Sequence, residues 1–165
     1  MSGERTRVVL IQHVLELSQR SNTGRHASGV VPSLDVRVFG AQGAPLRVDD
    51  LRADQDVWLL WPGGDTAVPV PKPRTLVVLD GSWSQARKMM QRVPELRKLP
   101  QWCVPPREGR VSLRAAPDGG MSSLEAMAAA IELLDGVEAA APVHAAHEAL
   151  VQKQLRERGY VGPMK

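Results

Sequence analysis

The chain has 165 residues, of which 43% are hydrophobic and 24% charged, with a formal net charge of +3 and a pI of about 9.4. This is the size and composition of one folded domain, and the mild positive charge permits a nucleic-acid partner without requiring one. The single cysteine, Cys103, excludes an internal disulfide and a multi-cysteine zinc site. No run approaches the roughly 18 apolar residues of a membrane span, and the first residues lack the apolar core of a signal peptide. We therefore expect a soluble cytoplasmic protein.

Four buried strands are predicted in the first half of the chain, because short apolar runs rich in branched side chains are bounded by turn residues. These runs are residues 8–11, 34–39, 57–61 and 76–79. Residues 12–17 can form a short helix after the first strand. Pro62 and Gly63 are expected to end the third strand, and the proline-rich segment 69–73 is expected to be an extended connection.

A helix is predicted directly after the fourth strand. Ser82 followed by Gln85 is a capping-box signature for a helix start. The apolar side chains of the following residues share one helical face, and Pro94 is expected to bound the helix. The residues on this face are Trp83, Ala86, Met90 and Val93.

The second half of the chain predicts one more strand and two helices. Residues 111–114 are a strand candidate, and residues 117–120 a loop. A second capping box, Ser122 with Glu125, opens a helix that extends to about Leu134, and residues 142–158 form the last helix. Strands that alternate with helices predict an α/β fold with a mostly parallel sheet flanked by helices, in a single domain over 1–165.

Three predicted strand ends carry glycine-rich turns, at residues 61–64, 79–82 and 116–120. Glycine lets the backbone approach a ligand closely, so these loops would form one small-molecule crevice if their strands are neighbours. The alternative is that glycine and proline simply end strands at these places. In an open α/β sheet, a crevice of this kind lies at the carboxyl ends of the strands.

The chain resembles the DTW-domain family over about residues 8–134. The motifs that carry this resemblance are Leu10-Ile11-Gln12-His13 with Glu16, Asn22-Thr23, Leu60-Trp61-Pro62-Gly63, Leu79-Asp80-Gly81-Ser82-Trp83-Ser84-Gln85-Ala86 and Ser122-Ser123-Leu124-Glu125-Ala126. The family belongs to the wider group of SPOUT-like α/β folds, so the resemblance implies a trefoil knot in the C-terminal part of the chain.

The resemblance further implies a tRNA-uridine aminocarboxypropyltransferase. Such an enzyme transfers the 3-amino-3-carboxypropyl group of S-adenosylmethionine to N3 of a uridine in tRNA and releases 5′-methylthioadenosine. The partners would be tRNA and S-adenosylmethionine. A SPOUT-type RNA methyltransferase and a non-catalytic RNA-binding module are the competing interpretations. The oligomeric state stays open.

Asp80 is the catalytic candidate that the resemblance implies, as the base for the uridine imide proton or as a residue that orients the imide and the amino group of the donor. The alternative is an acidic turn residue that accepts hydrogen bonds from nearby N–H groups. The donor-binding candidates are Leu60, Trp61, Pro62, Gly63, Leu79, Gly81, Ser82, Trp83, Ser122, Ser123, Leu124 and Glu125.

Several of these candidates also have a structural interpretation. Ser122 can be a plain helix cap, or it can open a helix whose N–H groups meet the carboxylate of the donor. Trp83 can stack on a base or belong to the core. His13 can act in the site or make a buried hydrogen bond, and Glu16 lies in the same family motif. Basic residues that would attract RNA phosphates are Arg25, Arg87, Lys88 and Arg92.

Two departures from the family pattern concern capping and metal binding. The family motif has threonine where this chain has Ser82, which keeps the hydroxyl. Many members carry an N-terminal cysteine cluster of zinc-binding type, whereas here the first strand begins almost at once. His144 and His147 have a spacing that suits a metal, but no further ligand is evident. We therefore expect no metal.

Overall fold

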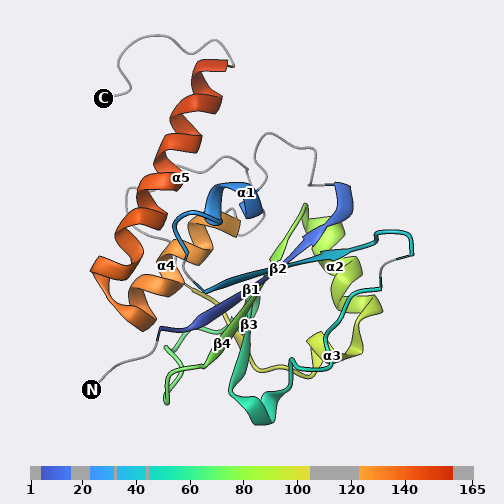
Figure 1. The fold of residues 1–165 in the computed structure, drawn as a ribbon. Coiled ribbons are helices and arrows are strands. Elements are labelled where there is room, and N and C mark those ends of the chain that lie inside the picture. The colour runs from blue at the N-terminus through green and yellow to red at the C-terminus, as the bar shows by residue number, and fades with distance from the viewer. Residues whose placement is uncertain (1–4, 16–22, 32, 44, 105–122, 158–165) are drawn as a thin grey trace.

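The structure is a computed structural model that describes residues 5–15, 23–31, 33–43, 45–104 and 123–157. In chain order (Figure 1) the elements are β1 (Arg7–His13), α1 (Thr23–Ala27), β2 (Leu34–Phe39), η2 (Ala53–Gln55), β3 (Val57–Asp65), β4 (Thr75–Asp80), α2 (Trp83–Arg92), α3 (Pro94–Arg97), β5 (Gln101–Trp102), α4 (Ser123–Asp135) and α5 (Val137–Glu157).

The five strands form one sheet in the order β2-β1-β4-β3-β5, and every strand pair is parallel. The central strand β1 pairs with β2 on one side and with β4 on the other, so that Val8 lies opposite both Leu34 and Leu76. This confirms the predicted α/β class with a parallel sheet. Because the strands are parallel, their carboxyl ends meet at one edge of the sheet.

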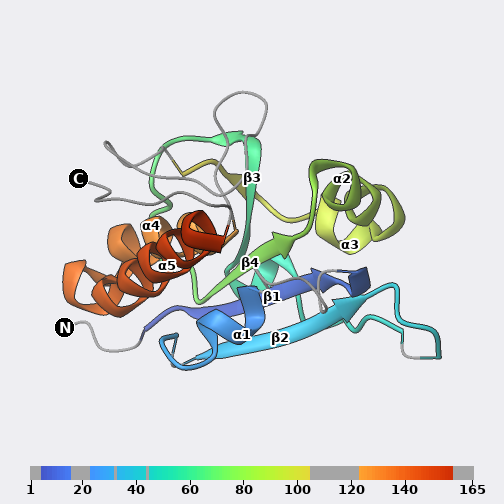
Figure 2. The ribbon, with the colours of Figure 1, turned by 90° about the horizontal axis from the view of Figure 1, so that it is seen from above.

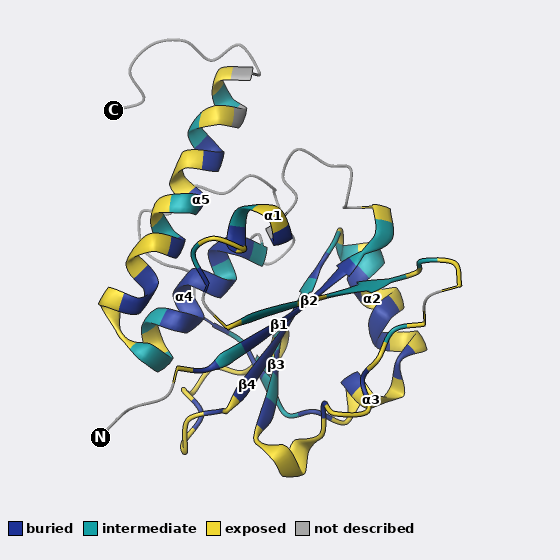
Figure 3. Ribbon diagram, in the orientation of Figure 1, coloured by how far each residue is buried: buried dark blue, intermediate teal, exposed yellow. Residues whose placement is uncertain are grey.

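Helices cover both faces of the sheet, and consecutive residues of β1 supply the two cores (Figures 1 and 2). Val8 and Leu10 pack on one face with residues of α1, α4 and α5. Val9 and Ile11 pack on the other face with residues of α2 and α3. Burial on both faces explains why the strands read as continuous apolar runs rather than as an alternating pattern. Figure 3 shows buried residues along the strands and on the helix sides turned toward them.

Helix α2 begins as the sequence predicts. Ser82 Oγ accepts from the backbone N–H of Gln85 at 3.2 Å, and Gln85 Oε1 accepts from the N–H of Ser82 at 2.7 Å. The predicted inner face is confirmed for Ala86, Met90 and Val93, which are buried, whereas Trp83 is half-buried. Met89 is also fully buried, although the predicted face does not include it. Pro94 bounds α2 and then occupies the first turn of α3.

Strand β3 is longer than expected. Pro62 and Gly63 do not end it, because β3 continues to Asp65 and pairs with β5 through an irregularity between Leu60 and Asp65. The described ladder with β4 stops at Leu59, so Pro62 does not have to donate a hydrogen bond to that strand.

Two other boundaries differ from expectation. Residues 12 and 13 continue β1 rather than starting a helix. Helix α5 begins at Val137 and not at Pro142, because Gly136, with a φ of +103°, ends α4 and lets the next helix start at once. Pro142 then lies within α5 on its exposed side, where its missing N–H is tolerated.

The predicted strand 111–114, the loop 117–120 and Ser122 lie outside the described residues. The segment that joins β5 to α4 belongs to the same part of the chain, so the trefoil knot stays a prediction. Among the described helices, none is both long and apolar enough to cross a membrane.

Candidate functional site at the carboxyl edge of the sheet

Asp80 is the last residue of β4 and is only 2% exposed. Its Oδ2 accepts a hydrogen bond of 3.0 Å from Nε2 of Gln12, which lies directly opposite on β1 and is 1% exposed. Helix α1 closes over this pair at Gly24, where an added Cβ would lie 2.7 Å from Oε1 of Gln12. A carboxylate is thus buried at the edge where the strands end, with its orientation fixed by an amide.

The turn after Asp80 is packed tightly against its neighbours. A Cβ added to Gly81 would lie 2.7 Å from Gln85 Oε1, the atom that caps α2, and 3.4 Å from Cβ of His13. The ring of His13 packs near Phe39 with centroids 5.8 Å apart, and its Nδ1 accepts from the N–H of Leu15. His13 therefore lies beside the turn, and Glu16 lies outside the described residues.

Helix α4 begins next to the end of β4. Ser123 Oγ donates to the backbone carbonyl of Leu79 at 3.1 Å, which joins two predicted site residues that are 44 positions apart. Leu124 is 1% exposed and belongs to the core, whereas Glu125 is a carboxylate only 5% exposed in the first turn of the helix. This bond places the start of α4 beside the end of β4, whereas the third predicted turn, 116–120, lies outside the described residues.

Strand β3 reaches the same region through an aromatic contact. Trp61 meets Trp83, the first residue of α2, edge to face with ring centroids 6.3 Å apart. Trp61 also packs against the α2 and α3 side of the core, and Leu60 packs against the opposite core. Pro62 and Gly63 are exposed. Both tryptophans are half-buried, so each packs against the protein on one side and is accessible to solvent on the other.

The basic candidates lie on two sides of the sheet. Arg25 is exposed on α1, on the side of α4 and α5, whereas Arg87, Lys88 and Arg92 are exposed on α2 on the opposite side (Figures 1 and 2). Helix α2 has three basic residues and no acidic one, so its outer surface is cationic.

The two histidines of α5 have different surroundings. Nε2 of His144 lies 2.8 Å from Oε1 of Glu132 on α4. His147 is buried, and its Nε2 has no hydrogen-bond partner among the described residues. Within the described part of the chain, no group of three or more histidine, cysteine, aspartate or glutamate side chains is arranged to hold a metal.

Gln12 is the site residue to which sequence reasoning assigned no role. A signal for it exists, because Gln12 follows the apolar run 8–11 in the same way that Asp80 follows the run 76–79. In adjacent parallel strands, polar residues that end such runs face each other at one edge.

Comparison with known proteins relates the chain to one family. The DTW domain matches residues 1–155. Among solved structures, the chain is similar to the SAM-dependent rRNA:acp-transferase Tsr3 from Vulcanisaeta distributa, with a TM-score of 0.50 and 15% sequence identity over 92% of this chain and 82% of that one. At this identity the likeness concerns the fold. A search of curated proteins finds no match.

Proposed function

Because the chain belongs to the DTW domain family, we propose that it is an aminocarboxypropyltransferase that acts on RNA and uses S-adenosylmethionine as the donor. The observation that carries this proposal is the buried carboxylate of Asp80, held by Gln12 at the edge where β1 and β4 end. The structurally similar protein Tsr3 is an rRNA:acp-transferase that depends on the same donor, which supports the reaction class.

The finer proposal is transfer to N3 of a uridine in tRNA. The N3–carbon bond forms as the carbon–sulfur bond of the sulfonium breaks, methylthioadenosine leaves and the imide proton departs. Asp80 would accept this proton, or it would orient the imide and the amino group of the donor. The sulfonium needs no acid because it is already a good leaving group, so the protein's main task is to position the two reactants.

The residues at this edge fit a donor that carries positive charge. Asp80 and Glu125 are both buried carboxylates, and they belong to elements that meet where Ser123 donates to Leu79. Buried carboxylates favour a sulfonium or an ammonium group, while the first N–H groups of α4 favour the donor carboxylate. Backbone groups of residues 60–63 and 79–83 would hold the adenosine portion of the donor. Residues 122–125 would surround its amino-acid portion.

The RNA would be attracted by exposed cations on either side of the sheet. Arg25 on α1 and the basic residues of α2 would neutralise phosphates in a salt-dependent way. Helix α2 is well placed for this role, because only two residues separate its start from the end of β4. We also retain the expectation of a trefoil knot in the C-terminal part of the chain.

The test is incubation of the purified protein with S-adenosylmethionine and unmodified tRNA, followed by nucleoside mass spectrometry and chromatography of the by-product. Aminocarboxypropyl-uridine with an equal amount of methylthioadenosine is the expected result. A methylated nucleoside with S-adenosylhomocysteine would instead assign the chain to RNA methylation. Product formed only on rRNA would retain the reaction class and replace the substrate.

Asp80→Asn is the matched variant, since it keeps the size of the side chain and removes the base. We expect loss of turnover with donor binding, measured by calorimetry, nearly intact. Asp54→Asn is the control, because this exposed aspartate precedes β3 at the opposite edge of the sheet and pairs with Arg52. Unchanged turnover in Asp80→Asn would remove Asp80 from the mechanism.

A further inference from the structure

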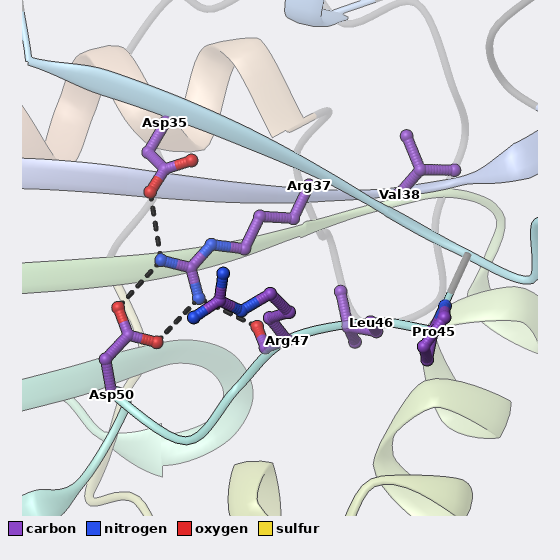
Figure 4. Close-up of a pocket in the computed structure, with 7 residues that line it drawn as sticks. All are labelled: Asp35, Arg37, Val38, Pro45, Leu46, Arg47 and Asp50. Atoms are coloured by element: carbon purple, nitrogen blue, oxygen red, sulfur yellow. Dashed lines mark hydrogen bonds and ion pairs between the residues drawn. The ribbon is translucent and has the colours of Figure 1, made fainter.

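A cavity of about 500 Å³ lies at the free edge of the sheet, between β2 and the segment that follows it (Figure 4). Its size is within the range of small-molecule sites. It is lined by Asp35, Arg37, Val38, Pro45, Leu46, Arg47 and Asp50. Since Arg37 is in register with Ile11, and Leu46 packs against the same core as Ile11, the cavity lies on the α2 and α3 side of the sheet.

One end of the cavity is formed by Arg37, whose guanidinium is hydrogen-bonded to neighbouring groups of the chain. The Arg37 guanidinium donates to both carboxylate oxygens of Asp50, at 2.8 and 2.7 Å, and to Asp35 at 2.9 Å. It also donates to the backbone carbonyl of Arg47 at 2.8 Å, which ties the 45–50 segment to β2. Arg7 lies within 3.6 Å of Asp35 and 3.5 Å of Asp50.

Arg47 is the cation of this cavity that stays uncompensated. The two aspartates are balanced by Arg37 and Arg7, whereas the exposed Arg47 side chain has no ion pair among the described residues. Its backbone is held by Arg37, so the guanidinium is presented from a fixed base. The cavity therefore offers a positive group for an anion and carboxylate oxygens that can accept from hydroxyl or amino groups.

The other end of the cavity is apolar. Pro45 is exposed and Leu46 is half-buried there, on the side toward the carboxyl end of β2 (Figure 4). The apolar side chains of Pro45 and Leu46, an arginine and two carboxylates offer one contact each to a base, a phosphate and the sugar hydroxyls of a ribonucleotide.

The cavity also lies near the candidate site. Val38 is opposite Gln12 on β1, and Gln12 is opposite Asp80 on β4. Two strand spacings are roughly 10 Å, the length of about three stacked nucleotides. By strand alternation Gln12 and Asp80 face the α1 and α4 side of the sheet, whereas the cavity lies on the α2 and α3 side. An RNA whose target uridine lies at Asp80 would therefore cross the carboxyl edge of the sheet to bring a further nucleotide to the cavity.

We propose that this cavity binds one nucleotide of the RNA substrate outside the reacting uridine, with its phosphate on Arg47. This inference rests on the proposed RNA-modifying function. Arg47 is then a substrate-binding residue with no part in the chemical step.

The test compares Arg47→Glu with Arg52→Glu, which makes the same charge change on an exposed arginine that does not line the cavity. With transcribed tRNA, Arg47→Glu should raise the KM for RNA and leave kcat and the KM for S-adenosylmethionine unchanged. The slope of log K against log salt for RNA binding, measured by fluorescence anisotropy, should fall by about 1. Arg52→Glu should leave both quantities at the wild-type value.

Equal effects in the two variants, or none in Arg47→Glu, would overturn the proposal. Titration with uridine monophosphate, alone and in competition with labelled tRNA, tests whether the cavity binds a free nucleotide rather than RNA. Binding of uridine monophosphate at micromolar concentration that Arg47→Glu abolishes, with tRNA neither displaced by the nucleotide nor weakened by the substitution, would make the cavity a free-nucleotide site and would also overturn the proposal. Because RNA binding is measured without turnover, a failure of the proposed chemistry is distinguishable from a failure of this site.

Discussion

Gln12 Nε2 donates to Asp80 Oδ2 across 3.0 Å, between residues 68 positions apart that lie opposite each other in adjacent parallel strands. Both side chains are almost fully buried. A buried carboxylate that accepts from an amide is held in one orientation, because rotation would cost it this hydrogen bond. The geometry of Asp80 therefore depends on the pairing of β1 with β4.

Gln12→Ala should impair turnover more than substrate binding. Loss of the amide leaves Asp80 without this donor, and misplacement of a reacting group by about 1 Å can cost roughly a hundredfold in rate. Loss of a buried hydrogen bond should also lower the free energy of unfolding by about 1–3 kcal/mol. Steady-state kinetics and urea denaturation measure the two effects. Gln91→Ala, on the exposed side of α2, should change neither, and a wild-type kcat in Gln12→Ala would contradict the positioning role.

Gly24→Ala should act on the same pair from helix α1. Alanine in a helix is favoured over glycine by about 1 kcal/mol, so propensity alone predicts a more stable protein. Here the new Cβ would lie 2.7 Å from Oε1 and 3.1 Å from Cδ of buried Gln12, which must shift. We expect lower turnover and no gain in melting temperature. Gly29→Ala is the control, since a Cβ there meets nothing within 4 Å, and full activity in Gly24→Ala would show that Gln12 adjusts freely.

The predictable part of the fold is the part with strong local signals. Val8 to Ile11 and Leu76 to Leu79 predict strands from their own composition, and Ser82 with Gln85 predicts the start of α2. Asp80 could be chosen as a site residue because it ends such a strand. Gln12 also ends an apolar run, but its bond to Asp80 depends on the pairing of two distant segments, which neither run shows by itself.

The wrong boundaries arise where tertiary contacts override local preference. Gly64 lies so close to β5 that an added Cβ would be 2.5 Å from the backbone of Gln101, and this contact lets β3 continue past Pro62. Helix α5 starts before Pro142 because alanines 139 and 140 and Val143 are buried against the core shared with α4. The contact of Gly64 with β5 and the burial of the start of α5 both involve residues distant in the sequence, so local sequence patterns do not predict them.

Asp50 should make stability depend on acidity through its bond to Arg37. The hydrogen bonds from Arg37 lower the pKa of Asp50 from 3.8 to about 2, against the opposing effect of burial. A depressed carboxylate pKa contributes stability above about pH 3.8, and this contribution is lost as the pH falls toward 2. Because the Asp50 side chain is 44% exposed, solvent screening limits the contribution to about 1 kcal/mol or less.

The measurement is urea denaturation between pH 5 and pH 2. Wild type should lose stability more steeply over this window than Asp50→Asn, which has no carboxylate to protonate. Asp49→Asn makes the same charge change at the exposed neighbouring residue and should follow the wild-type curve. If the free energy of unfolding falls with pH equally in wild type and Asp50→Asn, the pH dependence does not come from Asp50.

His147 should destabilise the fold in mild acid. Burial lowers its pKa below 6.5, His144 lowers it further, and Glu148 opposes the shift. Below pH 6.5 the unfolded chain therefore binds a proton more readily than the folded one, so stability is fully present above this pH and falls as the pH drops toward the folded pKa. His147→Leu should remove this contribution, and it should keep or raise stability at pH 7.5 by about 1 kcal/mol, because the buried Nε2 has no described partner.

Glu148→Gln supplies the opposite test on the same helix. Removal of the carboxylate that favours the protonated ring should depress the His147 pKa further, so the loss of stability should continue to lower pH than in wild type. Chemical denaturation at half-unit steps from pH 7.5 to 5 compares the three proteins. If His147→Leu keeps the wild-type slope, His147 is not the titrating group and its assignment is wrong.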